Sequence, residues 1–491
     1  MTESSGAGQT ALIEAEVREG TYGAKVAAIE PGGAEFIPLS ERHGKPHNQF
    51  WTWVSPNMEF ATIFVGFLGV WYFGESFWQT FLAIIAGSAL GALSMGFLGA
   101  RGPLFGVPQM IISRLGFGFI GNILPAGINA VVAGVGWFAV NSVSGAFALN
   151  ALFHWNTKIC LLIVVVLQIA VAFVGHNFVH VFERIAFPIL VVIFIIASVF
   201  ITSKTHDIGT STGFHGGFGG WLVVFGAAFG YAAGWNPYAS DYTRYLSPTS
   251  NRAAAGAWAG VGIFLSCVWL ETIGAAAATI TSPDTYGGNP TAGFVSHLPT
   301  GVADATLLAI ALGAVCANAL NVYSGSISFL AIGFNVPLGL RRAIIALLFG
   351  ILGFLLALSG LHDAGEKYNN FLLVIAYWIG PWLGVVFTDQ LLRRGKSVRG
   401  LLFDKNHNPI AGFLAMLVAM VVSIYYFSDQ TEYVGQVAKH SNWKWGDLTP
   451  EVGFLLAAVL YALLFFLQRG KKHEDALLPS EVSPISAPPA D

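Results

Sequence analysis

Two apolar segments of this chain are each interrupted by a proline, Pro56 in the first half and Pro237 in the second. The first interruption reads Ser55-Pro-Asn57 and the second reads Asn236-Pro-Tyr238. Proline removes a backbone donor and clashes with the preceding helical turn, so each segment should unwind locally. In lipid, the freed backbone groups are tolerated only where they face protein or a water-filled cavity. Matched breaks in two halves of a chain therefore predict an internal repeat with a binding site between the halves, as in secondary transporters.

The composition predicts an all-α polytopic membrane protein. Of 491 residues, 55% are hydrophobic and 10% are charged, whereas a soluble domain carries about 25% charged residues. A spanning helix needs about 20 apolar residues. Twelve stretches meet this requirement, which predicts twelve transmembrane helices near 51–74, 78–100, 123–152, 157–177, 181–203, 219–240, 253–282, 302–332, 339–360, 366–391, 410–428 and 451–468.

The basic residues predict the orientation. With the N-terminus inside, 19 of the 24 Lys and Arg residues fall on the same side as the N-terminus. The positive-inside rule then places both termini in the cytoplasm of a protein spanning the plasma or inner membrane. Residues 1–48 carry no signal-peptide pattern. This segment and the tail at 474–491 have the polar composition of disordered chain.

Several other classes of protein find no support in the sequence. Cys160, Cys267 and Cys316 lie in apolar runs without metal-ligand spacing, so no metal site or disulfide framework is indicated. No catalytic motif is present, so we expect the protein not to be an enzyme and to need no cofactor. A channel would require paired Asn-Pro-Ala half-helices or a carbonyl filter, which are absent. A substrate sensor remains an alternative from a different class.

Amides and indoles inside the spans are candidates for substrate binding. Trp137 and Asn141 are four residues apart, and Asn318 and Asn321 are three apart, so each pair shares a helix face. The separation of Asn141 and Asn321 along the chain is nearly the same as that of the two prolines. Together with Trp235, they would suit a small planar ring, stacked by an indole and held by amides. The alternative is that these side chains only pack helices together.

Carboxylates inside spans are rare, so each is a functional candidate. Glu59 follows the first break, Glu183 opens the fifth span and Glu271 lies deep in the seventh. Each could take up and release a proton, although Glu183 could instead pair with an arginine. Asp241 and Arg244, at the inner end of the sixth span, are expected to form a gate or a structural ion pair.

The motifs together resemble the purine–cytosine permease group of the nucleobase–cation symporter family. The resemblance covers roughly residues 40 to 470 and rests on the order and spacing of six pieces. They are Gln49-Phe-Trp51-Thr-Trp53-Val-Ser55-Pro-Asn57, Gly102-Pro103 through Pro108, Gly136-Trp137 to Asn141, His180-Val-Phe-Glu183-Arg-Ile-Ala-Phe-Pro188, Asp241-Tyr-Thr-Arg244-Tyr245, and Asn369-Asn-Phe371 to Tyr377-Trp378-Ile-Gly-Pro381-Trp382.

The resemblance implies the leucine-transporter-like fold with alternating access. Two inverted five-helix repeats would occupy 49–203 and 219–391, with two further helices at 410–468. Glu183 matches a family glutamate linked to proton coupling, with Glu59 and Glu271 as further candidates. The substrate would be bound between spans one, three, six and eight by Ser55, Asn57, Trp137, Asn141, Trp235, and Asn318 or Asn321.

One departure from the family bears on the coupling ion. Sodium-coupled relatives carry hydroxyl ligands in span eight where this chain has Val315 and Cys316, neither a good ligand for a hard cation. We therefore expect a proton-coupled importer of cytosine or a purine, with sodium coupling as the alternative. The alternative function is that of the related carriers, which take allantoin, hydantoins, uracil, thiamine or pyridoxine. The partners implied are the substrate and the lipid bilayer, with no nucleic acid, and many relatives work as monomers.

Overall fold

The computed structural model describes residues 23–26, 30, 33–205, 217–281, 289–333, 338–362, 364–394, 396, 398–430, 432–440 and 446–468. The longer helical elements are α2 (Asn48–Val54), α3 (Phe60–Phe67), α4 (Phe77–Gly99), α8 (Ile123–Val131), α9 (Phe138–Phe153), α10 (Thr157–Val174), α11 (His176–Lys204), α12 (Gly217–Ala233), α14 (Arg252–Ile280), α16 (Thr300–Ala331), α17 (Leu338–Gly360), α18 (Ala364–Leu392), α19 (Ile410–Phe427) and α21 (Thr449–Gln468). Shorter helices are α5 (Gly102–Phe105), α6 (Gln109–Ile112), α7 (Arg114–Gly121), α13 (Ala239–Thr243), α15 (Pro290–Val295) and α20 (Gln436–His440).

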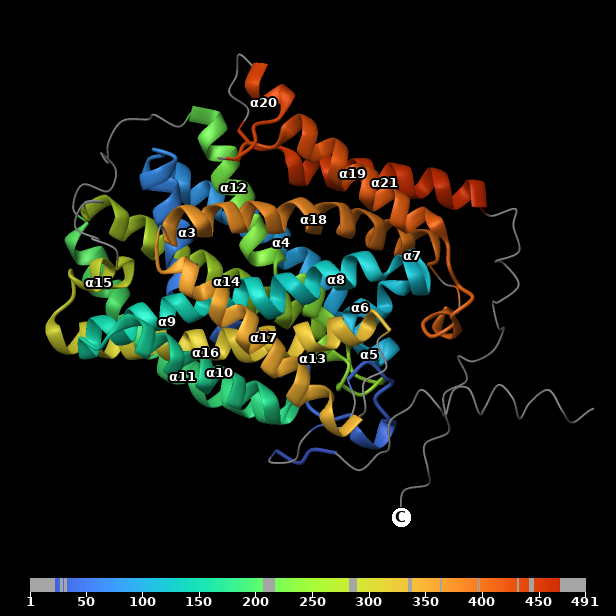
Figure 1. Ribbon diagram of the computed structural model, residues 1–491, viewed down its shortest axis with the longest axis horizontal. Coiled ribbons are helices and arrows are strands. Elements are labelled where there is room, and N and C mark those ends of the chain that lie inside the picture. The colour runs from blue at the N-terminus through green and yellow to red at the C-terminus, as the bar shows by residue number, and fades with distance from the viewer. Residues whose placement is uncertain are drawn as a thin grey trace, which may run out of the picture.

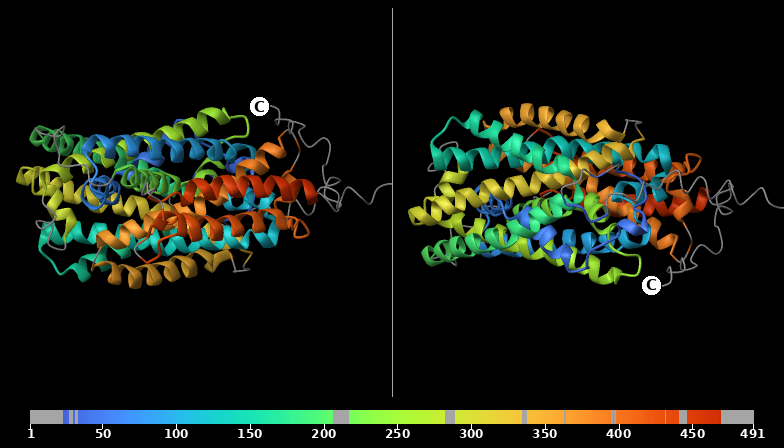
Figure 2. Two further views of the ribbon diagram at one scale, coloured as in Figure 1. Left: turned by 90° about the horizontal axis from the view of Figure 1, so that it is seen from above. Right: turned by 90° about the horizontal axis from the view of Figure 1, so that it is seen from below.

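Most helices run along the long axis of the molecule (Figures 1 and 2). Among the described residues, ten helices are long and apolar enough to cross a membrane. Two shorter apolar helices, Phe60–Tyr72 and Ile345–Gly360, coincide with the predicted first and ninth spans. The all-α multi-pass prediction is therefore confirmed, and the helix pattern is consistent with twelve spans. We call the end of the bundle that carries α5 and α7 the α5 end, and the opposite end, which carries α15, the α15 end (Figure 1).

Both predicted interruptions are present as single 3₁₀ turns. The first, η2 (Ser55–Asn57), separates α2 from α3, and the second, η5 (Asn236–Tyr238), separates α12 from α13. A carbonyl freed at the first break is satisfied locally, because the Thr62 hydroxyl donates to the backbone oxygen of Asn57 at 2.5 Å. The Glu59 carboxylate caps the start of α3 by accepting from the Ala61 N–H at 2.8 Å. Both contacts satisfy backbone groups that the ends of the interrupted helix leave without intrahelical partners.

Close packing of α4 against α12 fixes the helix that leads into the second break. A Cβ atom at Gly87 would lie 2.5 Å from the carbonyl oxygen of Phe225, and one at Gly91 would lie 2.6 Å from Cβ of Ala232. The small-xxx-small spacing of these glycines lets the two backbones approach closely. A larger residue at either position would push α12 outward and displace the site residues that follow it.

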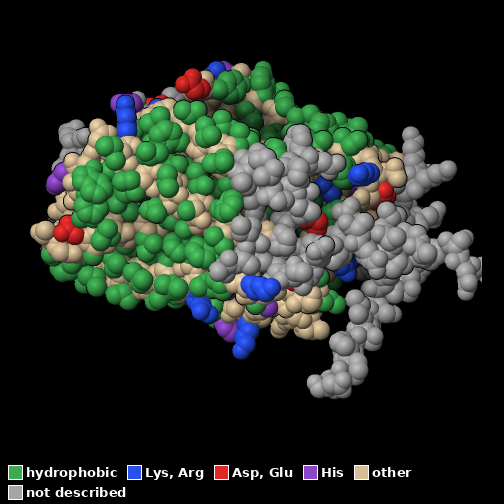
Figure 3. All heavy atoms as spheres, turned by 60° about the horizontal axis from the view of Figure 1, so that its bottom comes forward, with side chains coloured by type: hydrophobic (Ala, Val, Ile, Leu, Met, Phe, Trp, Pro, Cys, Tyr) green, Lys and Arg blue, Asp and Glu red, His purple; other side chains and the backbone are tan. Residues whose placement is uncertain are grey.

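The outer surface of the bundle is apolar. Figure 3 shows one face on which hydrophobic side chains form a broad area, with charged groups mostly near its edges. Large exposed apolar side chains occur on several helices, for example Phe97, Val131, Val199 and Leu467. An exposed apolar surface of this extent is stable only in contact with lipid or another apolar partner. This arrangement agrees with a multi-pass membrane protein.

A segment before α2 crosses the α5 end of the bundle. Arg42 donates to the carbonyl oxygen of Pro103 at 2.9 Å, and the N–H of His43 donates to the carbonyl oxygen of Tyr245 at 2.6 Å. We call residues 30 and 33–47 the N-terminal strap. It lies within residues 1–48, where composition predicted disorder, so ordered chain begins before position 49. Composition missed the strap because polar and backbone contacts hold much of it. Residues 1–22 and the predicted disordered tail at 474–491 lie outside the described residues.

Candidate substrate-binding site

The two broken helices meet at the centre of the bundle. The indole N–H of Trp235, one residue before η5, donates to Oδ1 of Asn57 in η2 at 2.9 Å. Asn57 is itself oriented, because its amide N–H donates to the carbonyl oxygen of Trp53 at 2.7 Å. Both site residues are buried. This hydrogen bond joins the two halves of the predicted repeat at the point where each helix is interrupted.

Three asparagines form one network between α9 and α16. Asn141 and Asn321, the pair whose separation matches that of the two prolines, both donate to Oδ1 of Asn318, at 2.9 and 3.1 Å. Asn318 donates in turn to the carbonyl oxygen of Phe138 at 2.9 Å. Oδ1 of Asn141 is buried and accepts no hydrogen bond from any described residue. An acceptor buried without a donor is costly, so this atom is available to accept a hydrogen bond from a ligand.

Trp137 lies at the end of a π-helical turn, Val132–Trp137, that connects α8 to α9. Such turns often occur at functional sites, because the extra residue redirects the side chains that follow. The indole contacts the rings of Tyr231 and Phe371 edge to face, at centroid distances of 5.4 and 5.2 Å. It also lies against Gly234, where an added Cβ would be 3.3 Å from the indole. Trp137 is therefore beside the second break.

Ser55 lies beside the candidate coupling residue Glu183. The Ser55 hydroxyl contacts the carbonyl oxygens of Trp51 and Glu183, at 2.8 and 3.0 Å. The Glu183 carboxyl group is fully buried next to Ser55 and Cys316. Neither carboxyl oxygen makes a hydrogen bond of good geometry with a described residue, and the nearest polar groups are the Ser55 hydroxyl and the Cys316 thiol. Within that part of the chain, no arginine is paired with Glu183, which was the structural alternative for this residue.

The other two candidate carboxylates have different surroundings. Glu59 accepts hydrogen bonds from Ser144 on α9 at 3.1 Å and from Tyr231 on α12 at 3.4 Å, in addition to capping α3. It therefore connects the first break to two neighbouring helices. Glu271, on α14, accepts from Ser88 on α4 at 3.2 Å. This contact joins two helices away from the amide network, so Glu271 is the candidate least connected to the site.

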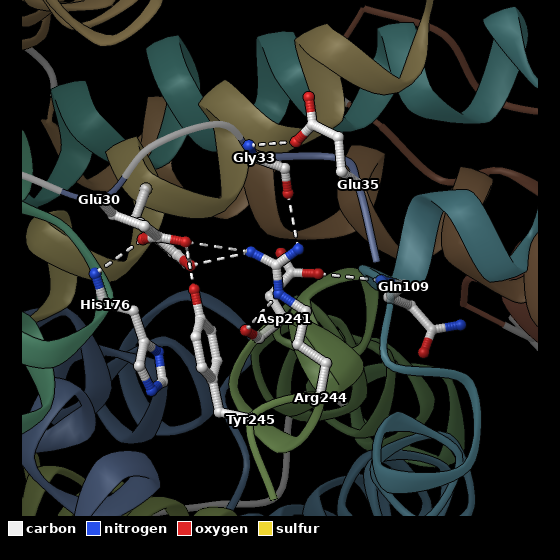
Figure 4. Close-up of polar contacts among 9 residues, drawn as sticks. Glu30, Gly33, Glu35, Gln109, His176, Asp241, Arg244 and Tyr245 are labelled. Atoms are coloured by element: carbon white, nitrogen blue, oxygen red, sulfur yellow. Dashed lines mark hydrogen bonds and ion pairs between the residues drawn. The ribbon is translucent and has the colours of Figure 1, made fainter. Parts of the chain in front are cut away.

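A buried polar cluster closes the α5 end (Figure 4). Arg244, directly after α13, forms an ion pair with Glu30 of the N-terminal strap at 3.5 Å, and neither side chain is exposed. The guanidinium also donates to the carbonyl oxygen of Gly33 at 2.6 Å. The Glu30 carboxylate accepts from the backbone N–H of His176 at 3.0 Å and from the Tyr245 hydroxyl. One glutamate thus connects the strap, α11 and the end of the sixth span.

The gate prediction needs a correction in its partners. Asp241 and Arg244 were expected to form a gate or a structural ion pair, but the Asp241 carboxylate accepts from the backbone N–H of Gln109 at 2.9 Å. Of the Asp241 atoms, Arg244 forms a hydrogen bond with the backbone oxygen, at 3.3 Å. Arg244 lies after the last residue of α13, where its side chain is directed to Glu30 of the N-terminal strap. Burial, with the cations Arg399 and Arg244 nearby, lowers the pKa of Arg42 to about 10.

Sequence reasoning missed several residues that complete the site. Glu30 was overlooked because it stands in a polar segment far from any span. Tyr238 donates to Oδ1 of Asn321 at 3.2 Å, and Tyr231 contacts the Thr62 hydroxyl at 2.5 Å. Tyr238 is the last residue of the second break and Tyr231 lies on the helix before it, so their closeness to Pro237 in the sequence was the available signal. No group of three or more His, Cys, Asp or Glu residues able to hold a metal occurs in the described part of the chain.

Paired broken helices that meet at a buried centre of amides and indoles define a secondary transporter built from inverted repeats. The chain belongs to the family described as permease for cytosine/purines, uracil, thiamine, allantoin, which matches residues 36–446. The family predicted by resemblance is therefore confirmed. Members of this family are carriers, so the prediction that the protein is not an enzyme is confirmed as well.

Individual relatives are similar over most of their length. The purine-cytosine permease fcyB of Emericella nidulans is 28% identical over 464 residues, which cover 89% of this chain and 88% of that protein. The purine-cytosine permease FCY2 of Saccharomyces cerevisiae is 26% identical over 435 residues, covering 84% and 81%. The fold resembles that of Mhp1, a nucleobase-cation-symport-1 family transporter, in a closed conformation with bromovinylhydantoin bound. That match has a TM-score of 0.70 at 18% identity and covers 90% of this chain and 96% of the other.

Proposed function

We propose that this protein imports a nucleobase, cytosine or a purine, together with a proton by alternating access. The observation that carries the proposal is the meeting of Asn57 and Trp235 across the two helix breaks, with Trp137 against the second break. The names of the fungal relatives support the substrate class.

The chemistry of the site fits such a substrate. A nucleobase is flat, so an indole face can stack on it, and its edge carries both N–H donors and carbonyl or ring-nitrogen acceptors. The unsatisfied Oδ1 of Asn141 offers an acceptor to an N–H group of the base. Ser55, Asn318 and Asn321 supply further polar groups around the same centre. Buried polar groups of this kind discriminate strongly, because a mismatched ligand leaves them unpaired.

Proton coupling is supported by Glu183 and by span eight. A buried carboxyl group with no cationic partner is accommodated at lower cost as the neutral acid, and it becomes costly once ionised. Such a group can couple proton release to a change of state. Val315 and Cys316 are both buried on α16. Neither side chain carries an oxygen atom, the ligand that sodium prefers. The 19 basic residues that lie on one side of the membrane support cytoplasmic termini and a cytoplasmic α5 end. A single chain contains all residues of the proposed site, which agrees with a carrier that works as a monomer.

Reconstitution into liposomes tests the proposal. Labelled cytosine, adenine and hypoxanthine would be offered beside uracil, allantoin, thiamine and pyridoxine, with an inward proton gradient or a sodium gradient. We expect accumulation of cytosine or a purine that a protonophore abolishes and that sodium does not affect. Glu183→Gln should keep substrate exchange and lose accumulation. Sodium-driven uptake that a protonophore leaves intact would contradict the proton assignment, and binding without counterflow would indicate a sensor.

A further inference from the structure

A cavity of about 200 Å³ lies beside the first turns of α11 at the α5 end. Three histidines line it: His43 from the N-terminal strap, and His176 and His180 from α11. Its wall also includes Gly44 and Arg184, which are exposed, so the cavity reaches the surface of the molecule. The proposed binding site does not use these histidines, and the cavity is separated from that site by the start of the first span.

Two contacts align α2, beside this cavity, with the part of α11 that carries His180 and Glu183. Nδ1 of His180 lies 3.0 Å from the Thr52 hydroxyl, and one turn deeper the Ser55 hydroxyl lies 3.0 Å from the carbonyl oxygen of Glu183. Both pairs span 128 residues, so the two helices keep the same register over this turn. His180 and Glu183 are three residues apart, about 4.5 Å along the helix axis. One intervening water or hydroxyl can bridge side chains at this spacing.

The hydrogen bonds also assign the tautomer of His180. The Thr52 hydroxyl donates to the carbonyl oxygen of Asn48 at 3.0 Å, so its oxygen is available to accept. His180 therefore donates through Nδ1–H, and its Nε2 carries the free lone pair. Imidazole changes its charge within the range of physiological pH and is the commonest proton shuttle among side chains. His180 is half-buried, between the dry Glu183 and the cavity.

The groups around His180 define its electrostatic surroundings. His176 stacks on it at a centroid distance of 6.0 Å, and Trp51 of α2 lies at 6.1 Å. The charged or titratable groups nearby are His43 from the strap, Arg184 on α11, and Tyr242 and Tyr245 at the end of the sixth span. Glu30 and Arg244 lie beyond His176, and the Glu30 carboxylate accepts a hydrogen bond from the backbone N–H of His176. Imidazoles beside a cavity that water can enter suit proton transfer.

We propose that His180 is the proton relay between Glu183 and the cavity, and this inference rests on the proposed proton coupling. After the carrier turns inward, the O–H bond of the Glu183 acid breaks, and its proton passes through one water or hydroxyl to Nε2 of His180. The imidazolium then releases a proton to water in the cavity and regains its neutral form. Glu183 remains as a carboxylate until it is reprotonated from the other side. No electrons are transferred.

Proteoliposomes with a pH-sensitive dye inside test the relay. His180→Gln keeps a polar side chain but cannot carry a proton, so proton-driven uptake and luminal acidification should fall roughly 10²-fold, the scale of general acid–base steps. Exchange of labelled for unlabelled base, which needs no net proton release, should stay close to the wild-type rate. His47→Gln is the matched control, because His47 is an exposed histidine near the same end that does not line the cavity.

A second variant separates a relay from a packing role. In His180→Ala, imidazole included in the liposome lumen should enter the vacated space and restore proton-driven uptake, and the recovery should follow the pH of the lumen through the titration of imidazole. Wild-type accumulation by His180→Gln would overturn the relay while leaving the proposed function intact. Loss of exchange together with accumulation, without recovery in imidazole, would make His180 a packing residue and would also overturn it. Failure of proton-driven uptake in the wild type would instead contradict the proposed function.

Discussion

Arg244 and Glu30 form an ion pair in which both side chains are completely removed from solvent, although they stand far apart in the sequence. Tyr323 on α16 joins the same pair, because its hydroxyl accepts from Arg244 at 3.1 Å and contacts Glu30 at 3.3 Å. The end of the sixth span is thus connected to the N-terminal strap and to the eighth span. In a carrier that works by alternating access, such a cluster keeps one end closed only while all three partners stay together.

We first predict that Glu30→Gln loosens the α5 end. The substitution keeps the shape of the side chain but leaves the Arg244 charge buried without its counter-ion, which is strongly destabilising for that closed arrangement. In a Cys160→Ser, Cys267→Ser background, the remaining Cys316 is buried beside Glu183. A thiol reagent applied from the α5 side should label it several-fold faster than in the same background with Glu30. Glu35→Gln, which removes a charge from the same strap, is the control. Equal labelling rates would refute the role.

Next, stacking of the substrate on Trp137 predicts a large effect of removing the indole. Trp137→Ala should raise the KM for uptake by a factor that corresponds to ~1–3 kcal/mol, the scale of base–aromatic stacking. Trp137→Phe, which keeps an aromatic face, should be milder. Uptake kinetics at matched surface expression measure both. If Trp137→Ala transports like the wild type, the indole only packs against Tyr231 and Phe371.

The amide network predicts a division of roles. Asn141→Ala removes the unsatisfied acceptor and should change the ranking of nucleobases, with a small change in Tm. Asn318→Ala leaves the donors of both Asn141 and Asn321 without their shared acceptor, and each buried unpaired group costs about 1–3 kcal/mol. Its main effect should therefore be a lower Tm. Competition assays and thermal denaturation in detergent separate the two outcomes, and the same Tm loss in both variants would mean that Asn141 is structural.

Finally, Glu75 predicts a pH-dependent stability. It lies in the connection before α4, 2% exposed, and burial raises its pKa to about 7. The folded protein then holds a proton on Glu75 between about pH 4.5 and 7 that the unfolded chain has released, so stability falls as the pH rises through this window. Glu75→Gln should raise the Tm at pH 8 and leave it nearly unchanged at pH 4.5. The exposed Glu366→Gln is the control. A benefit that is equal at both pH values would exclude titration as its cause.

The features set by local chemistry could be predicted from the sequence. Pro56 and Pro237 predicted the positions of η2 and η5. A proline alone does not decide where a span is interrupted, because α11 and α18 continue through Pro188 and Pro381. The matching separation of Asn141 and Asn321 also predicted that the two breaks belong to corresponding halves. Trp137, Asn141 and Trp235 could be chosen as candidates because the first two share a helix face and the third directly precedes the Asn236-Pro237 break.

The features set by long-range packing could not be predicted. Glu30 pairs with Arg244 across the fold, and no periodicity links a polar segment to the end of a distant span. Asn318 and Asn321 looked equivalent, but the three-dimensional arrangement makes Asn318 the shared acceptor of the other two amides. Likewise, Asp241 and Arg244 are close in sequence, yet Gln109 and Glu30 are their partners. In each case the functional groups can be identified in the sequence, but which of them are in contact depends on the three-dimensional fold.

The N-terminal strap has a consequence for how the protein is made. Its residues leave the ribosome first, but its partners Arg244 and Tyr323 follow Glu30 by 214 and 293 residues. At ordinary rates of about 5–20 residues per second, the strap waits at least about ten seconds before it can bind. During that interval the carboxylate of Glu30 remains in water, so no desolvation free energy opposes its charge. The closed α5 end can form only after the second half of the protein has been inserted, so an incomplete chain cannot assemble a sealed carrier.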